Sequence, residues 1–175
     1  TIEAIKKHSN WLIAISKERI RDEFLKIIES SRAHEGVELM RETGILEHVI
    51  PELLEGIGVD QNLHHIYTVW EHNLRALKYT VEKKYSLAVR LAALLHDVGK
   101  PRTKRGEGKY STFYGHDAVG ARMAIKIADR LKFPGDIADR VTRLVRYHLF
   151  YYNVGEVTES SVRRLLMKVG SENMD

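Results

Sequence analysis

The residues best suited to chemistry in this sequence are its histidines, which number nine among 175 residues. His96 is followed directly by Asp97, and the pair ends the apolar run 91–95. Such a run is buried, and an unpaired charge in a buried place is unfavourable. Imidazole and carboxylate are both good ligands for first-row divalent metals, so a bound cation would offset that cost. The pair predicts one edge of a metal site whose other ligands come from other helices.

Three further histidines are predicted to face the interior of the fold. His72 lies on the buried face of a helix expected over residues 66–83, His116 begins the apolar stripe of the next long helix, and His148 extends the stripe of 137–149. For one histidine alone, a buried ring satisfied by a backbone carbonyl is the commoner explanation. Four together, one beside an aspartate, indicate a metal site, because polar groups on core stripes need partners.

The other five histidines give weaker signals. His64 and His65 precede the helix of His72 and are candidates to support the metal ligands or to face a substrate. His8, His34 and His48 stand among charged residues, where a surface or packing role is expected.

The elements that must position these side chains are helices. Apolar residues recur at helical spacing, and this pattern predicts helices around 20–28, 37–46, 66–83, 87–98, 119–131, 137–149 and 162–169. Gly and Pro interrupt the pattern over 99–115, which predicts a long loop with a short extended piece near 110–114. The expected fold class is all-α.

Composition excludes several classes of protein. With 43% hydrophobic and 30% charged residues the chain has an ordinary globular balance, which argues against intrinsic disorder. The absence of cysteine excludes disulfides, thiolate metal sites and a cysteine nucleophile. No apolar stretch approaches the roughly 18 residues of a membrane span, so no membrane partner is expected and the cytoplasm is the expected compartment.

The predicted loop after the His-Asp doublet is rich in cations. Against Glu107 alone it carries Lys100, Arg102, Lys104, Arg105 and Lys109. Cations beside a metal site would attract a phosphorylated or nucleic-acid ligand. A simple solvated loop is the alternative, and position beside the doublet gives the two interpretations about equal weight.

Asp117 stands next to His116 and has two possible roles. Its carboxylate would orient that histidine or take up a proton during catalysis. Alternatively it is an acidic residue at a helix N-terminus, stabilised there by the helix dipole, and the residue types slightly favour this second interpretation.

His72 followed by His96-Asp97 and the sequence Val98-Gly99-Lys100 resembles the HD superfamily of metal-dependent phosphohydrolases. Longer segments resemble the C-terminal part of bacterial CCA-adding tRNA nucleotidyltransferases and their poly(A) polymerase relatives. These segments are ERIRDEFLKII, RETGILEHVIPEL, HHIYTVWEHNLRAL and FYGHDAVGA. The resemblance covers nearly the whole chain.

The resemblance implies roles for particular residues. His72, His96 and Asp97 fall on the HD metal ligands, and His116 and His148 fall where members with two metals place extra histidines. Lys100 falls where relatives direct a lysine at a phosphate. A histidine-rich set suits Mn²⁺, Fe²⁺, Co²⁺, Ni²⁺ or Zn²⁺ better than Mg²⁺. One or two ions are expected, and with two ions Asp97 is the expected bridge.

The resemblance also implies an architecture and a function. A helical RNA-binding module over 1–58 would precede an HD helical bundle over 59–175. The activity would be metal-dependent cleavage of phosphoester bonds by Asp97, Lys100 and Asp117, with tRNA, another RNA or a phosphorylated nucleotide as ligand. Two elements of the pattern are missing, the distant HD aspartate and the nucleotidyltransferase head, so a fragment of a longer enzyme is expected. A non-catalytic tRNA-binding scaffold and a stand-alone HD nucleotidase are the alternatives.

Overall fold

The computed structural model describes residues 1–62, 66–149 and 158–170, and every regular element within these ranges is a helix. The prediction of an all-α fold is confirmed. In place of the extended piece expected near 110–114 there is a single antiparallel bridge between Arg105 and Thr112. No helix among the described residues is long and apolar enough to span a membrane.

The N-terminal third of the chain is built from short helices. They are α1 (Ile2–His8), η1 (Ser9–Ala14), α2 (Lys17–Glu29), α3 (Ala33–Glu42), α4 (Ile45–Val49) and η2 (Pro51–Gly56). Ser16 caps α2 by accepting a hydrogen bond from the backbone N–H of Arg19, and the helix buries Ile20, Phe24 and Ile28. The spacing of these three residues, four apart, is the reason that one face of α2 enters the core.

The remainder of the chain carries the longer helices. They are α5 (Val69–Glu82), α6 (Leu87–Leu95), α7 (Lys100–Thr103), η3 (Gly108–Tyr110), α8 (His116–Leu131), α9 (Gly135–Tyr147) and α10 (Glu159–Val169). The predicted start of α5 at residue 66 is wrong by three residues. Thr68 and Glu71 form a reciprocal capping box that begins the helix at Val69. The predicted loop 99–115 also contains the short helices α7 and η3.

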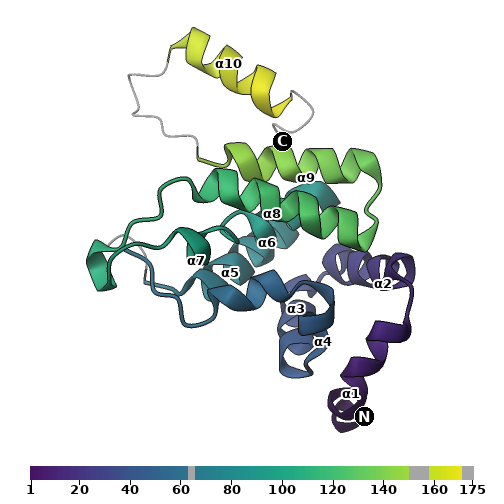
Figure 1. Cartoon of the computed structure of the whole chain (residues 1–175). Helices are drawn as coiled ribbons and strands as arrows, with labels where there is room; N and C mark the ends of the chain where they lie inside the picture. The colour runs from purple at the N-terminus through teal and green to yellow at the C-terminus, as the bar shows by residue number, and fades with distance from the viewer. Residues whose placement is uncertain (63–65, 150–157, 171–175) are drawn as a thin grey trace.

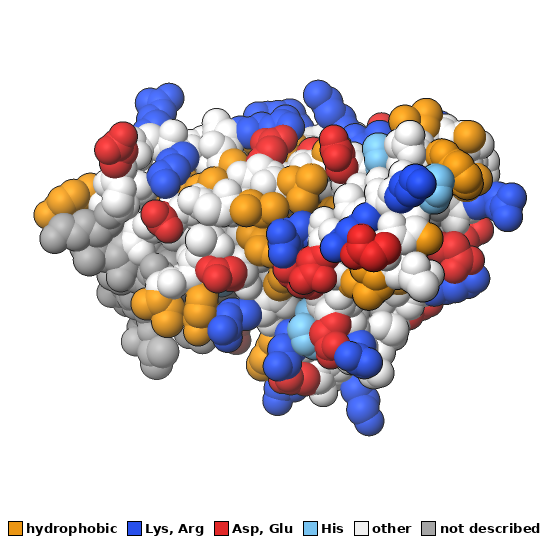
Figure 2. Space-filling model, turned by 90° about the horizontal axis from the view of Figure 1, so that it is seen from below, with side chains coloured by type: hydrophobic (Ala, Val, Ile, Leu, Met, Phe, Trp, Pro, Cys, Tyr) orange, Lys and Arg blue, Asp and Glu red, His pale blue; other side chains and the backbone are white. Residues whose placement is uncertain are grey.

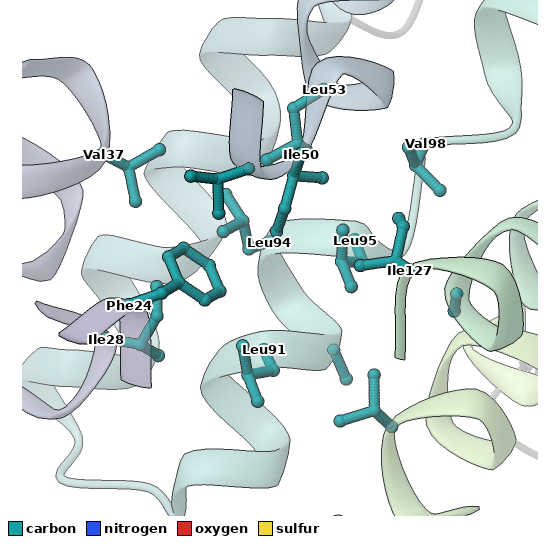
Figure 3. Packing of buried hydrophobic residues seen from close by; sticks show 14 of the residues in the cluster. Phe24, Ile28, Val37, Ile50, Leu53, Leu91, Leu94, Leu95, Val98 and Ile127 are labelled. Carbon is teal, nitrogen blue, oxygen red and sulfur yellow. The ribbon is translucent and has the colours of Figure 1, made fainter. Parts of the chain in front are cut away.

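Helix α6 lies at the centre of the molecule. It packs against α2 and α5 on one side and α9 on the other, α8 packs against α9, and α10 lies over α9 (Figure 1). Leu91, Leu94 and Leu95 of α6 are fully buried, and Figure 3 shows them between Phe24 of α2 and Ile127 of α8. The His96-Asp97 doublet follows directly after the last residue of this buried helix.

The backbone after the doublet lies unusually close to α8. A Cβ atom added at Gly99 would lie 2.3 Å from the carbonyl oxygen of His116 and 2.6 Å from the amide nitrogen of Gly120. Only a residue without a side chain fits at that position. Gly99 therefore allows the segment carrying His96 and Asp97 to meet the start of α8, where His116 stands.

Candidate metal centre

Helix ends bring five predicted ligands together. His72 lies in the first turns of α5, His96 is the C-cap of α6, His116 is the first residue of α8 and His148 is the C-cap of α9. Asp97 follows His96 and is only 2% exposed. Residues far apart in the sequence thus meet around one carboxylate.

One oxygen of Asp97 faces a first pair of histidines. Oδ2 lies 3.2 Å from Nε2 of His96 and 3.5 Å from Nε2 of His72, and the two ring nitrogens are 3.0 Å apart. These three ligand atoms form one group able to surround a cation.

The other oxygen of Asp97 faces a second pair. Oδ1 lies 3.2 Å from Nε2 of His116 and 3.7 Å from Nε2 of His148, and these two nitrogens are 3.2 Å apart. This is a second group with the size needed for a cation. The carboxylate of Asp97 belongs to both groups, one oxygen to each.

Backbone carbonyls orient three of the rings. The Nδ1 atoms of His96, His116 and His148 each lie 2.7–2.8 Å from the carbonyl oxygen of the residue three positions earlier. A carbonyl oxygen only accepts hydrogen bonds, so Nδ1 is the nitrogen that carries the proton. In the neutral ring Nε2 then presents its lone pair to the cluster, which is the arrangement that metal-binding histidines have in proteins.

The distances within each group fit a first-row metal ion. Ligand atoms held about 2.1 Å from one ion, at angles of 90–110°, lie about 3.0–3.4 Å from each other. Four of the six separations here, 3.0–3.2 Å, lie within this range, and the distances from Asp97 to His72 and His148, 3.5 and 3.7 Å, lie slightly above it. Nitrogen supplies four of the six ligand atoms, a set that favours Mn²⁺, Fe²⁺, Co²⁺, Ni²⁺ or Zn²⁺ over Mg²⁺.

The charge of the site comes from Asp97. Burial raises the pKa of this carboxyl, whereas hydrogen bonds from His116, His148 and His96 lower it, and the resulting pKa lies well below the ordinary value. Asp97 is therefore ionised at neutral pH.

Lys100 lies against the same carboxylate. Its Nζ atom is 2.8 Å from Oδ2 of Asp97 and 2.6 Å from Oε1 of Gln61, and the residue is buried. Gln61 carried no signal in the sequence, because it stands in a polar segment without helical or strand periodicity. Its role in holding Lys100 is visible only in three dimensions.

A cavity of about 750 Å³ opens beside the cluster. Its walls carry the four histidines, Asp97 and Lys100 together with Asn62, Ser111, Thr112, Phe113, Tyr114, Gly115 and Leu149. Sequence reasoning did not identify Asn62 or Ser111. Each has a buried side-chain oxygen without a hydrogen-bond partner among the described residues. The cavity is large enough for a small phosphorylated ligand.

Three of the other cations predicted to bind phosphate are not among the residues that line the cavity. Arg102 forms a bidentate pair with Glu55, and Lys104 donates to the backbone carbonyl of Asp60 at 3.0 Å. Arg105 is exposed and pairs through its backbone with Thr112. The side chain of Lys109 lies outside the described residues. Lys100 is thus the predicted phosphate ligand that the described structure places at the cavity.

Asp117 has a different partner from the one predicted. Its carboxylate pairs with the guanidinium of Arg146 on α9, and Asp117 is not among the residues that line the cavity. A role in orienting His116 or accepting a proton stays a prediction. The candidates His64 and His65 lie outside the described residues.

Two family models match the chain. Residues 1–56 match the family described as the probable RNA and SrmB-binding site of polymerase A. Residues 69–169 match the HD domain, which covers more than half of the chain.

Curated bacterial proteins are similar over most of this chain. The A-adding tRNA nucleotidyltransferase of Deinococcus radiodurans is 39% identical over 136 residues, which cover 75% of this chain and 31% of the relative. The CC-adding tRNA nucleotidyltransferase of Thermus thermophilus is 36% identical over 158 residues, which cover 85% of this chain and 36% of the relative. The multifunctional CCA protein of Neisseria meningitidis is 30% identical over 157 residues, which cover 89% of this chain and 37% of the relative.

The chain spans about a third of the length of these relatives. The predicted resemblance to CCA-adding enzymes is confirmed at the level of family. The chain belongs to the HD domain family, and its residues 1–56 match the family described as the probable RNA and SrmB-binding site of polymerase A.

Proposed function

We propose that this chain is the RNA-binding and HD portion of a CCA-adding type of tRNA nucleotidyltransferase, and that its HD centre hydrolyses phosphoester bonds with a divalent metal. The observation that carries the proposal is the pair of ligand groups that share Asp97. Two groups of this size around one buried carboxylate are suited to a two-ion phosphoester hydrolase. Nucleotide addition would require a nucleotidyltransferase head in the parent protein.

The residues of the cluster have separate tasks in this proposal. His72 and His96 would hold one ion, His116 and His148 the other, and Asp97 both. When bound, such ions lower the pKa of a water molecule and polarise a phosphoryl oxygen. The ammonium of Lys100 would then stabilise negative charge on the non-bridging phosphoryl oxygens. Substrates of suitable size for the cavity are a 2′,3′-cyclic nucleotide and a phosphomonoester.

RNA binding is the second part of the proposal. It is supported by the match of residues 1–56 and by relatives whose names concern tRNA. Arg102, Lys104, Arg105 and Lys109 would contact the RNA backbone outside the cavity rather than the reacting phosphate. A tRNA ligand would also place the protein in the cytoplasm.

A scaffold without hydrolytic activity is the second candidate. The names of the Deinococcus and Thermus relatives describe addition of A or CC to tRNA and mention no hydrolysis. In this alternative the HD fold would hold tRNA for the nucleotidyltransferase head, and its cluster would have a structural role.

The two candidates are distinguished by assay of the purified chain with Mn²⁺, Co²⁺ or Ni²⁺. The substrates are 2′,3′-cyclic AMP and p-nitrophenyl phosphate, and Asp97→Asn is the control for contaminating activity. Hydrolysis that requires metal and is lost in Asp97→Asn supports the hydrolase. A chain that elemental analysis shows to be loaded with metal, and that hydrolyses neither substrate, supports the scaffold.

A further inference from the structure

We propose that Gln61 is a positioning residue, which holds the Lys100 ammonium at the wall of the cavity in the orientation needed to bind a phosphoryl oxygen. This inference rests on the proposed hydrolase and extends it to a residue outside the helices that carry the ligands. Gln61 precedes α5 and is 4% exposed.

The Lys100 ammonium is held from two directions. Nζ lies 2.6 Å from Oε1 of Gln61 and 2.8 Å from Oδ2 of Asp97, and it stands 5.5 Å from the centroid of the Phe113 ring. An ammonium group has three N–H donors. Two of them are directed at Gln61 and Asp97, and because Lys100 lines the cavity the third is available to a ligand there.

The orientation of the Gln61 amide is itself determined by the backbone. Its Nε2 donates to the carbonyl oxygen of Tyr67 at 3.0 Å, so Oε1 is the atom that faces Lys100. On either side of Gln61 in the sequence, the amide of Val69 donates a hydrogen bond of 2.9 Å to the carbonyl oxygen of Val59. Gln61 therefore presents a fixed acceptor to a flexible lysine side chain, which has four rotatable bonds.

The chemistry of an amide suits this task. Asp97 already offsets the positive charge of Lys100. A second carboxylate at position 61 would give these three side chains a net charge of −1, which repels a phosphate. A neutral amide accepts a hydrogen bond without adding charge. Gln61 thus orients the ammonium while preserving its attraction for an anion.

A double-mutant cycle tests whether Gln61 acts through Lys100. Gln61→Leu removes the acceptor at similar volume and is expected to lower kcat/KM for 2′,3′-cyclic AMP roughly 10-fold, and Lys100→Met roughly 100-fold or more. In the Lys100→Met background Gln61→Leu should change kcat/KM by less than about 2-fold. Additive effects would overturn the proposal.

A matched control weakens a different side-chain contact of α7, one that lies away from the cavity. Glu55→Gln weakens the pair with Arg102, which joins η2 to α7 away from the cavity, and should leave kcat/KM unchanged. If Glu55→Gln lowers kcat/KM as much as Gln61→Leu does, general loosening of this region explains both variants and the proposal is wrong.

Two further measurements do not depend on hydrolysis. In ¹⁵N NMR spectra of the wild type, the signal of the Lys100 ammonium should be visible because its protons are protected from exchange with water. This signal is assigned by its loss in Lys100→Met. In Gln61→Leu it should broaden beyond detection. Inorganic phosphate should bind Gln61→Leu roughly 10-fold more weakly than wild type. Wild-type behaviour of Gln61→Leu in both measurements would refute the role of Gln61, even if the chain proved to hydrolyse nothing.

Gln61→Glu keeps the test decisive if the leucine variant does not fold. It retains an oxygen for Lys100 and adds a negative charge. The ammonium signal should persist while inorganic phosphate binds more weakly than to wild type. Phosphate affinity equal to that of wild type would contradict the assigned role.

Discussion

At the scale of single residues, Asp97 is the side chain on which the cluster depends. Each of its oxygens faces a different pair of histidines, and Lys100 contacts one of the same oxygens. The histidines divide into pairs, whereas Asp97 belongs to both. The consequences of substitution should therefore differ between the carboxylate and the rings.

Substitution of the ligands should reveal this division. Asp97→Asn should weaken binding of the first and the second Mn²⁺ ion by more than the roughly 10–100-fold produced by loss of a group that merely orients a ligand. His72→Ala and His148→Ala should each weaken the binding of one ion. Isothermal titration with Mn²⁺, checked by elemental analysis, measures both. Equal loss of both ions in His148→Ala would argue against two separable sites.

At the scale of elements, the ends of helices position the candidate metal ligands. His96 and His148 are C-caps, where their Nδ1 atoms reach carbonyls of the preceding turn. His116 is brought within reach of Asp97 because Gly99 and Gly120 allow the backbones of two segments to touch. The geometry of the cluster thus depends on backbone contacts as well as on ligand identity.

Gly99→Ala should disturb this contact. The added methyl group would meet backbone atoms of α8 that cannot move aside cheaply, and overpacking of this kind costs about 1–3 kcal/mol. Urea denaturation measures the loss of stability, and Mn²⁺ affinity should fall in parallel. Gly135→Ala is the control, because its Cβ would enter open space at the start of α9. Equal stability of the two variants would show that the close approach is unimportant.

The capping box of α5 provides a test of the helix that carries His72. Thr68→Ala removes the hydroxyl that accepts from the Glu71 amide and should destabilise the protein by about 1 kcal/mol, whereas Thr68→Ser should retain most of the stability. Thermal unfolding monitored by circular dichroism provides the measurement. Equal losses in the alanine and serine variants would exclude the hydroxyl as the cause.

The contribution of this cap should depend on pH. Hydrogen bonds from the Thr68 backbone N–H and then from its hydroxyl lower the pKa of the Glu71 carboxyl below its ordinary value. A carboxyl whose pKa is lower in the folded state stabilises the fold above its unfolded pKa, and this contribution is lost as the pH falls through the folded pKa. The difference in stability between wild type and Thr68→Ala should therefore shrink in acid. A difference that stays constant from neutral pH down to pH 3 would contradict this account.

At the scale of the whole molecule, the two regions matched by different families share one hydrophobic core. Phe24, Ile28 and Val37 from the first region belong to the same buried cluster as Leu91 and Ile127 from the second (Figure 3). On the face in Figure 2, Lys and Arg side chains are interspersed with Asp and Glu. The core is therefore the feature that unites the regions, and contact with RNA on this face would involve individual cations rather than a uniform basic surface.

A shared core predicts cooperative unfolding. Urea transitions followed by tryptophan fluorescence and by far-ultraviolet circular dichroism should coincide, because neither region can lose its core contacts alone. Two separated transitions would show that the regions are independent.

The pair between Glu52 of η2 and Arg130 of α8 should contribute to this cohesion. Two hydrogen bonds of 2.7 Å join them, and Glu52 is largely buried. Glu52→Gln should lower the free energy of unfolding by about 1–2 kcal/mol. Glu159→Gln disrupts an exposed pair with Arg163 on α10 and should have little effect. Indistinguishable urea midpoints for the two variants would contradict the prediction.

The sequence by itself determined the helices and the candidate ligands, because both depend on local patterns. Apolar residues at helical spacing specify which face of a helix is buried. A histidine on such a face, such as His116 or His148, or a doublet ending an apolar run, such as His96-Asp97, is therefore assigned to the interior by its spacing alone. The family resemblance depended on the same residues together with longer segments such as ERIRDEFLKII.

Only the tertiary structure decided how polar groups are paired. It assigned one oxygen of Asp97 to each histidine pair, joined Gln61 to Lys100, and directed Arg102 and Lys104 toward the segment 55–60. Partners in irregular segments have no periodicity from which to infer them. Hydrogen bonds between residues far apart in sequence form only after packing has brought their backbones together.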